Sequence, residues 1–225
     1  MRDTPLRLVI FDVDGTLIDS QAHILASMEW TFTKAGLPVP ARAEALGIVG
    51  LSLPEAMEVL APDASAAKRA ELVTHYKESF AHLRQNGERP SFFPGALAAI
   101  RALDEAGYLM SVATGKSRRG LNRLLDQADL RRYIICGQTA DDAPSKPHPQ
   151  MVLNCLAATG VEAANAVMVG DTEFDMVMGH GAGCHTIGVD WGYHPRERVA
   201  GAPVTEIISD FEALIPALDR IWGSP

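Results

Sequence analysis

The chain has 225 residues, of which 47% are hydrophobic and 21% charged, an ordinary composition for a folded globular protein and one that argues against a disordered chain. Its 20 basic and 28 acidic residues give a formal net charge of −8, so we expect no broad basic surface for nucleic acid or for an anionic membrane. An acidic protein that handles anionic substrates needs local positive charge from a few lysines, helix N-termini or a metal ion.

The first predicted element is a buried strand, Leu8 to Phe11, which is continuously apolar and ends at Asp12-Val13-Asp14-Gly15-Thr16. From Ser20 to Arg89 the pattern becomes helical and shows no strand signal. Three helices are expected there: one capped by Ser20 and ended by Gly36, one over Pro54 to Leu60, and one capped by Ser65 and ended by Gly87. Their apolar positions are Ile24, Met28 and Phe32 in the first and Leu72, Tyr76, Phe80 and Leu83 in the last.

Strands and helices alternate in the rest of the chain. Further strands are expected at residues 108–113, 133–136, 166–169 and 185–189, with helices between Gly95 and Gly107, after Pro149 up to Gly160, and from Asp210 to Trp222. Pro216 predicts a kink or a restarted turn in the last helix. Such alternation predicts an α/β fold, a Rossmann-like doubly wound parallel sheet. The sheet domain would comprise residues 1–18 and 90–225, with an all-helical insert at 19–89 and hinges near Leu17–Ser20 and Glu88–Phe93.

Cys136, Cys155 and Cys184 are odd in number, far apart and without CxxC spacing, which predicts free thiols in a reducing compartment. The apolar run from Leu6 to Phe11 is too short for a signal sequence or a membrane span. We therefore expect a cytoplasmic protein with no membrane attachment.

Polar residues follow four of the expected strands or the loops after them. The sets are Asp12 to Thr16, Thr114-Gly115-Lys116, Lys146-Pro147, and Gly170-Asp171-Thr172-Glu173-Phe174-Asp175. In a parallel sheet these would converge on one cleft, and carboxylates gathered there need a cation between them. Oxygen ligands without a His or Cys cluster favour Mg²⁺, while a lysine and a Thr-Gly turn suit a phosphate dianion.

These four sets, in this order, resemble the four motifs of the haloacid dehalogenase superfamily, and the match spans nearly the whole chain. The helical insert lies where that superfamily places an α-helical cap over the active site. Phe93-Pro94-Gly95 and Trp191-Gly192-Tyr193 further resemble phosphoglycolate phosphatase-type members.

The resemblance implies a Mg²⁺-dependent phosphatase in which Asp12 forms an aspartyl-phosphate and Asp14 serves as acid and then base. It implies that Thr114, Gly115 and Lys146 bind the phosphoryl group. The implied metal ligands are Asp12, Asp14, Asp171, the Val13 carbonyl, and Asp175 directly or through water.

Each motif alone has a structural explanation: a turn or a calcium loop, a surface lysine, or a helix N-cap at Gly170-Asp171-Thr172. We read His180, His185 and His194 as structural or solvent-facing. Lys116, Arg118 and Arg119 either add positive electrostatic potential at the entrance of the cleft or belong to an ordinary solvent-exposed surface.

Two other functions stay open, a β-phosphoglucomutase-like phosphomutase and a non-catalytic phosphometabolite-binding protein. The presence of Asp14 argues against a dehalogenase, whose halide leaving group needs no proton.

The expected partner is a small phosphorylated metabolite, with phosphoglycolate the first candidate and sugar phosphates, pyrophosphate or a nucleotide as alternatives. Candidate residues for reading the leaving group are His23, Trp30 and the loop Gly50-Leu51-Ser52, although His23 and Trp30 could equally belong to the core or surface of the insert. No nucleic-acid partner is expected, and the protein would be a monomer or homodimer.

Overall fold

The computed structural model describes residues 5–85 and 90–223 and contains a six-stranded sheet in which every neighbouring pair is parallel. The strand order is β5-β4-β1-β6-β7-β8. The strands are β1 (Leu8–Phe11), β4 (Leu109–Thr114), β5 (Ile134–Thr139), β6 (Ala166–Gly170), β7 (His185–Val189) and β8 (Glu206–Ile208). The predicted α/β class and parallel sheet are confirmed.

Strand β1 lies at the centre of the sheet, between β4 and β6. The chain adds β4 and β5 on one side of β1 and then crosses over to add β6, β7 and β8 on the other. This reversal opens a crevice beyond the carboxyl ends of the central strands, which is where such sheets bind ligands. Asp12 follows directly after β1 at this point.

Alternate side chains of β1 enter two separate apolar layers, as the pleat requires. Val9 and Phe11 pack with helices α5 (Ala96–Glu105), α6 (Arg118–Gln127) and α10 (Leu214–Trp222) on one face. Leu8 and Ile10 pack with α7 (Gln150–Thr159) and α8 (Glu173–Gly181) on the other. Burial on both faces explains why β1 is continuously apolar in sequence.

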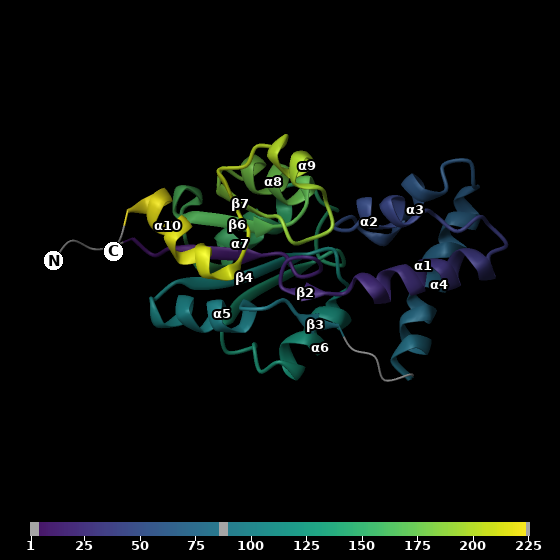
Figure 1. Ribbon diagram of the computed structural model, residues 1–225, viewed down its shortest axis with the longest axis horizontal. Helices are drawn as coiled ribbons and strands as arrows, with labels where there is room; N and C mark the ends of the chain where they lie inside the picture. Colours follow the sequence, from purple (N-terminus) through teal and green to yellow (C-terminus); the bar gives the residue numbers. More distant parts are fainter. Residues whose placement is uncertain (1–4, 86–89, 224–225) are drawn as a thin grey trace.

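Four helices form an insert that stands beside the carboxyl edge of the sheet (Figure 1). They are α1 (Gln21–Lys34), α2 (Arg42–Gly47), α3 (Leu53–Leu60) and α4 (Ala66–Gln85). The helical insert has its own apolar core, which includes Met28, Phe32, Met57, Leu72 and Tyr76. Met28 and Phe32 of the first predicted stripe and Leu72 and Tyr76 of the last belong to this core, whereas Ile24 packs in a separate cluster with Tyr193. The side chain of Phe80 and residue Gly87 lie outside what the structure describes.

The two connections between sheet and helical insert run side by side. Strand β2 (Ile18–Asp19) pairs antiparallel with β3 (Ser91–Phe92), and the Phe93 N–H donates to the Leu17 carbonyl at 3.0 Å. Short strands therefore lie where hinges were predicted, because the two segments form backbone hydrogen bonds with each other. Residues 88 and 89 of the second predicted hinge lie outside the described residues.

Several elements differ from the sequence prediction. Helices α2, α6 and α9 (Arg196–Ala200) and strand β8 were not among the predicted elements. Helices α2 and α9 and strand β8 are short and carry few apolar positions, whereas α6 carries three leucines at helical spacing, a pattern that was overlooked. Helix α6 buries only Leu121 and Leu125 on its inner face. Pro216 is the third residue of α10, which restarts after a 3₁₀ turn at Phe211–Ala213. The proline is tolerated there because first-turn N–H groups lack helical partners anyway.

The segment after β7 connects the sheet to the helical insert. Tyr193 packs against Ile24, Leu46 and Val49 of the insert. His194 is buried; its Nδ1 accepts the Glu173 N–H at 3.3 Å, so its Nε2 carries the proton and donates to the Gly47 carbonyl at 3.1 Å. Burial lowers the pKa of His194, a change that the charge of Arg198 reinforces. The structural role predicted for His194 is confirmed, and the alternative of a solvent-facing side chain is wrong.

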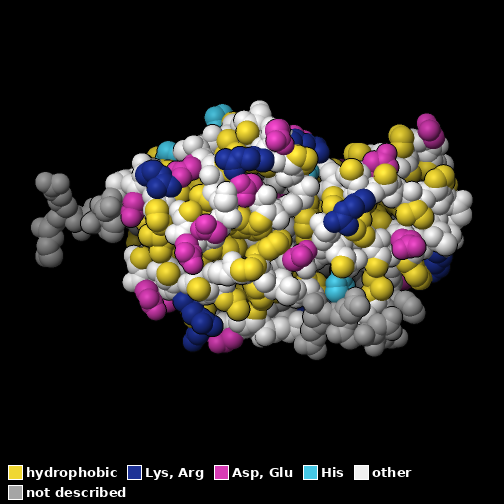
Figure 2. All heavy atoms as spheres, viewed as in Figure 1, with side chains coloured by type: hydrophobic (Ala, Val, Ile, Leu, Met, Phe, Trp, Pro, Cys, Tyr) yellow, Lys and Arg dark blue, Asp and Glu magenta, His cyan; other side chains and the backbone are white. Residues whose placement is uncertain are grey.

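Among the described helices, none is both long and apolar enough to cross a bilayer. On the face seen in Figure 2, basic side chains are interspersed with acidic ones rather than gathered in a stripe.

Replacing His194 with Phe should lower the free energy of unfolding by about 1–3 kcal/mol at pH 8, because two buried hydrogen bonds are lost. The pKa of His194 is lowered in the folded state, so its stabilising contribution is complete above the unfolded value of about 6.5 and falls as the pH drops below it. Urea unfolding of the two proteins should therefore give a smaller difference at pH 5.5 than at pH 8. The control is His180→Phe on the exposed surface of α8. An equal difference at both pH values would contradict the assignment.

Candidate active site

A cavity of about 400 Å³ lies between the carboxyl ends of the central strands and the helical insert. The sheet contributes Asp12, Asp14, Thr114, Gly115 and Lys116 to its wall. The insert contributes residues of α1, α3, α4 and the loop before α3. Residues of the first two predicted motifs therefore line this cavity, whereas Lys146, Asp171 and Asp175 lie outside its wall and meet Asp12 in the buried part of the site.

Lys146 holds two aspartates together in the buried part of the site. Its Nζ donates to Oδ1 of Asp12 and to Oδ1 of Asp175, both at 2.7 Å, and its side chain is fully buried. The other oxygen of Asp175 accepts the backbone N–H and the hydroxyl of Thr172, which caps helix α8. The N-cap of α8 at Thr172 therefore also positions the predicted site residue Asp175.

Asp171 is fixed from several sides. The Thr16 hydroxyl donates to its Oδ1 at 2.9 Å, and the Tyr193 N–H donates to its Oδ2 at 2.8 Å. A Cβ on Gly15 would lie 2.2 Å from the Asp171 carboxylate, and one on Gly192 would lie 2.1 Å from the Asp171 Cβ. Gly15 also has φ +87°, a conformation that favours glycine. These two glycines are required because the backbone approaches Asp171 from both directions.

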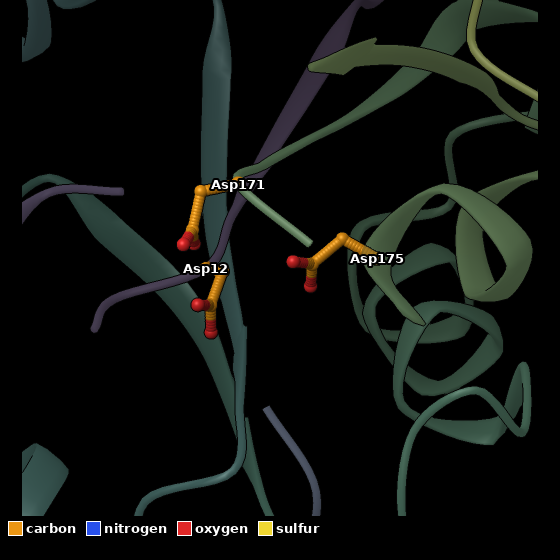
Figure 3. Close-up of side chains that lie close together, drawn as sticks. All are labelled: Asp12, Asp171 and Asp175. Carbon is orange, nitrogen blue, oxygen red and sulfur yellow. The ribbon is translucent and has the colours of Figure 1, made fainter. Parts of the chain in front are cut away.

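The carboxyl groups of Asp12, Asp171 and Asp175 come together although they belong to different elements (Figure 3). One oxygen from each lies within 4.8 Å of the others, and all three side chains are buried. Lys146 supplies one positive charge against their three negative charges, so two negative charges remain when all are ionised.

Burial and mutual repulsion disfavour the ionised aspartates. Burial raises the pKa of Asp12 to about 7; Lys146 opposes the shift and Asp175 adds to it. Burial, followed by the charges of Asp12 and Asp175, raises the pKa of Asp171 well above its ordinary value. Burial alone would lower the pKa of Lys146, but Asp12 and Asp175 outweigh it and hold that pKa above its usual range. The cluster therefore favours a bound cation.

Asp14 occupies a separate, partly exposed position with its own partners. Lys116 Nζ donates to its Oδ1 at 2.7 Å, and the Ser20 hydroxyl donates to the same oxygen. The Ser20 hydroxyl also lies 3.0 Å from the hydroxyl of Tyr193. Ser20 precedes α1 as predicted, but its side chain makes no capping bond because it is bound to Asp14 instead. The pairing also gives Lys116 a specific partner, which neither reading from the sequence had assigned to it.

The Val13 carbonyl is not available to a metal ion, which corrects the prediction. It accepts the backbone N–H groups of Thr16, Leu17 and Ile18, at 3.3, 2.9 and 2.9 Å. These bonds close the tight turn after β1 and use the lone pairs that an ion would need. Among the described residues, the Asp14 carbonyl accepts no backbone hydrogen bond of this kind.

The loop before α3 touches the phosphate-binding candidates directly. A Cβ on Gly115 would lie 2.8 Å from the Gly50 carbonyl oxygen and 3.0 Å from that of Leu51. The Ser52 N–H donates to the Ser145 hydroxyl at 2.7 Å. Gly50 and Leu51 line the cavity, whereas Ser52 and His23 are buried outside its wall. Trp30 instead packs edge-on against His75 of α4.

Comparison with known proteins agrees with this geometry. A family described as haloacid dehalogenase-like hydrolase matches residues 9–189. A probable phosphatase, IndB of Dickeya dadantii, is 32% identical over 223 residues and covers 97% of each chain. A phosphoglycolate phosphatase of Agrobacterium fabrum is 32% identical over 234 residues, covering 97% of this chain and 95% of the relative.

The chain belongs to the haloacid dehalogenase-like hydrolase family. The resemblance inferred from its motifs is confirmed, and the prediction of a phosphatase agrees with the names of these relatives. The fold is shared with the crystal structure of a predicted phosphoglycolate phosphatase from Haemophilus somnus. That structure has a TM-score of 0.84 at 19% identity and covers 96% of this chain and 99% of its own.

Sequence reasoning about this haloacid dehalogenase-like hydrolase missed the partners that support its motifs. Thr16, Ser20, Lys116 and Tyr193 each bind an aspartate of the site. Thr16 and Lys116 stand inside recognised motifs, so their position was a usable signal. No local pattern indicated that Ser20 and Tyr193 would meet, since they are 173 residues apart.

Replacing Gly192 with Ala should lower the free energy of unfolding by about 1–3 kcal/mol, because the added methyl group overlaps Asp171. Gly201→Ala is the matched control, since the nearest atom to its added Cβ is 3.4 Å away. Urea unfolding of both variants measures the difference. Equal stability of the two would contradict the close packing of Gly192 on Asp171.

Proposed function

We propose that the protein is a Mg²⁺-dependent phosphatase that hydrolyses small phosphate monoesters through an aspartyl-phosphate on Asp12. In this proposal residues 1–18 and 90–225 form the catalytic core, and residues 19–89 form a helical cap that encloses the substrate. The observation that carries it is the buried cluster of three aspartates around one lysine. Its two uncompensated negative charges match a divalent cation.

The donor set fits Mg²⁺ because the cluster offers only oxygen ligands. Asp12 and Asp171 would bind the ion through carboxylate oxygens, and the Asp14 carbonyl is the available backbone ligand. Both oxygens of Asp175 already have protein partners, which favours contact through water. When bound, the ion neutralises charge on the phosphoryl group and helps to orient it.

Two aspartates divide the chemistry between them. A carboxylate oxygen of Asp12 attacks phosphorus, and the bond from phosphorus to the leaving oxygen breaks. Asp14 gives a proton to that leaving oxygen and later takes one from the water that hydrolyses the aspartyl-phosphate. Both line the same cavity, and Lys116 and Ser20 hold Asp14 in place.

Lys146 serves first to orient the nucleophile. Two of the three N–H donors of its ammonium bind Asp12 and Asp175, which leaves one for a phosphoryl oxygen. Thr114 and the Gly115 N–H border the cavity beside Asp12 and are suited to the remaining phosphoryl oxygens.

The name of the Agrobacterium relative makes phosphoglycolate the first substrate to test. A phosphatase is favoured over a β-phosphoglucomutase-like phosphomutase because the Dickeya and Agrobacterium relatives are both named phosphatases. A non-catalytic binder is disfavoured because Asp12 and Asp14 are both present at one cavity.

Release of phosphate from p-nitrophenyl phosphate should require Mg²⁺ and should fall to background in Asp12→Asn, which removes the nucleophile. Asp14→Asn should lower kcat/KM by about 10²- to 10⁴-fold, the usual contribution of a positioned acid–base group. Asp63→Asn, an exposed position in the helical insert, is the charge-matched control. Activity that survives exhaustive chelation, or that persists in Asp12→Asn, would reject the mechanism.

Magnesium should stabilise the protein more at pH 8 than at pH 6. The pKa of Asp12 is raised to about 7, so ionising it costs the metal-free folded state stability as the pH rises from about 4 through 7. Mg²⁺ binds the ionised form and offsets this cost, whereas protons compete with it at lower pH. Thermal unfolding with and without Mg²⁺ at both pH values measures the effect. A Tm increase that does not depend on pH would contradict it.

A further inference from the structure

The side of the cavity that faces the catalytic aspartates is apolar. The helical insert contributes branched and long aliphatic side chains to it from two stretches of chain: Ile24 and Met28 of α1, and Ile48, Val49, Leu51 and Leu53 at and before the start of α3. The other lining residues of the insert are Gly50, Ala56, Tyr76 and Lys77. Because the sheet supplies the groups suited to phosphate, this apolar wall contacts whatever is attached to the phosphoryl group.

The charged side chains of the cavity do not alter this picture. Lys116 is already paired with Asp14 at 2.7 Å. Lys77, Arg119 and Asp141 also line the cavity, and all three are solvent-exposed residues. Among the described residues, the insert offers no buried cation in this wall to a second anionic group.

The wall therefore discriminates between leaving groups by charge. A carboxylate pressed against the aliphatic side chains of this wall loses its hydration and gains no ionic partner from them, which is unfavourable. An alkyl or aryl group loses unfavourable contact with water at the same place and gains dispersion contacts. A cavity of about 400 Å³ has room for a phosphoryl group and several carbon atoms.

We propose that the preferred substrate is a phosphate monoester whose leaving group is an uncharged, apolar alcohol or phenol, rather than a carboxylate-bearing one such as glycolate. This inference rests on the proposed phosphatase function and specifies the substrate class of the same site. The reaction balances as one ester and one water giving one alcohol and one inorganic phosphate. The bond from phosphorus to the leaving oxygen breaks, and that oxygen receives its proton from Asp14.

The test compares alkyl phosphates of increasing length with 2-phosphoglycolate, using the full chain with Mg²⁺. Isobutyl phosphate is the matched partner of phosphoglycolate, since a dimethyl-substituted carbon replaces the carboxylate with the same number of heavy atoms. We expect kcat/KM to be at least tenfold higher for isobutyl phosphate. From ethyl to hexyl phosphate, kcat/KM should rise by up to about fourfold for each buried methylene until the cavity is filled.

A pair of lysine variants on one helix tests the wall itself. Leu53 lies at the start of α3 and lines the cavity, whereas Val59 lies later in the same helix, is 59% exposed and is outside the wall. Leu53→Lys should lower kcat/KM for hexyl phosphate at least tenfold. It should also lower the ratio of kcat/KM for hexyl phosphate to kcat/KM for phosphoglycolate. Val59→Lys should leave that ratio unchanged.

The outcomes separate the two proposals. If no ester is hydrolysed, the proposed function itself fails. If esters are hydrolysed in a Mg²⁺-dependent manner but phosphoglycolate exceeds isobutyl phosphate and chain length has no effect, only the apolar preference is overturned. The wild-type series decides this even if Leu53→Lys does not fold, which circular dichroism would detect.

Discussion

Three buried aspartates lie close together beside a single buried ammonium, that of Lys146, and this imbalance of charge governs how the site is built. Carboxylates this close destabilise one another unless each is held by donors and the excess charge is neutralised. Lys146 binds two of them, Thr16 and the Tyr193 N–H bind the third, and Thr172 binds the remaining oxygen of Asp175. The stability of this region and its proposed affinity for a cation therefore have the same origin.

The fold brings these partners together through the position of β1 at the point where the strand order reverses. The ends of β1, β4 and β6 supply the proposed nucleophile, the proposed phosphate-binding turn and Asp171, respectively. The segment from Trp191 to His194 then connects the site to the helical insert. It donates to Asp171, borders Ser20 and contacts the insert through Tyr193 and His194. A shift of the insert relative to the sheet would therefore change the contacts of Tyr193, which also hydrogen-bonds Asp171.

In the proposed function, chemistry and selectivity occupy opposite sides of one cavity. The sheet side carries groups suited to the phosphoryl group, which is the same in every monoester. The insert side would contact the leaving group, which differs between monoesters, and in this chain that side is largely aliphatic. A shared fold at 19% identity with a protein titled a predicted phosphoglycolate phosphatase therefore carries little information about the leaving group.

The parallel sheet, the helical insert and the set of aspartates could be predicted from the sequence, because strand ends and hydrophobic periodicity are local features. A helix N-cap at Gly170-Asp171-Thr172 could also be predicted, since capping depends on a few adjacent residues, and the structure assigns it to Thr172. The folded structure was needed to show that Ser20 binds Asp14 rather than capping α1, and that the Val13 carbonyl closes a turn rather than facing an ion. It likewise excluded His23 from the cavity wall and placed Ile24 there. These outcomes depend on contacts between residues that are far apart in the sequence, and the local sequence pattern carries no information about such contacts.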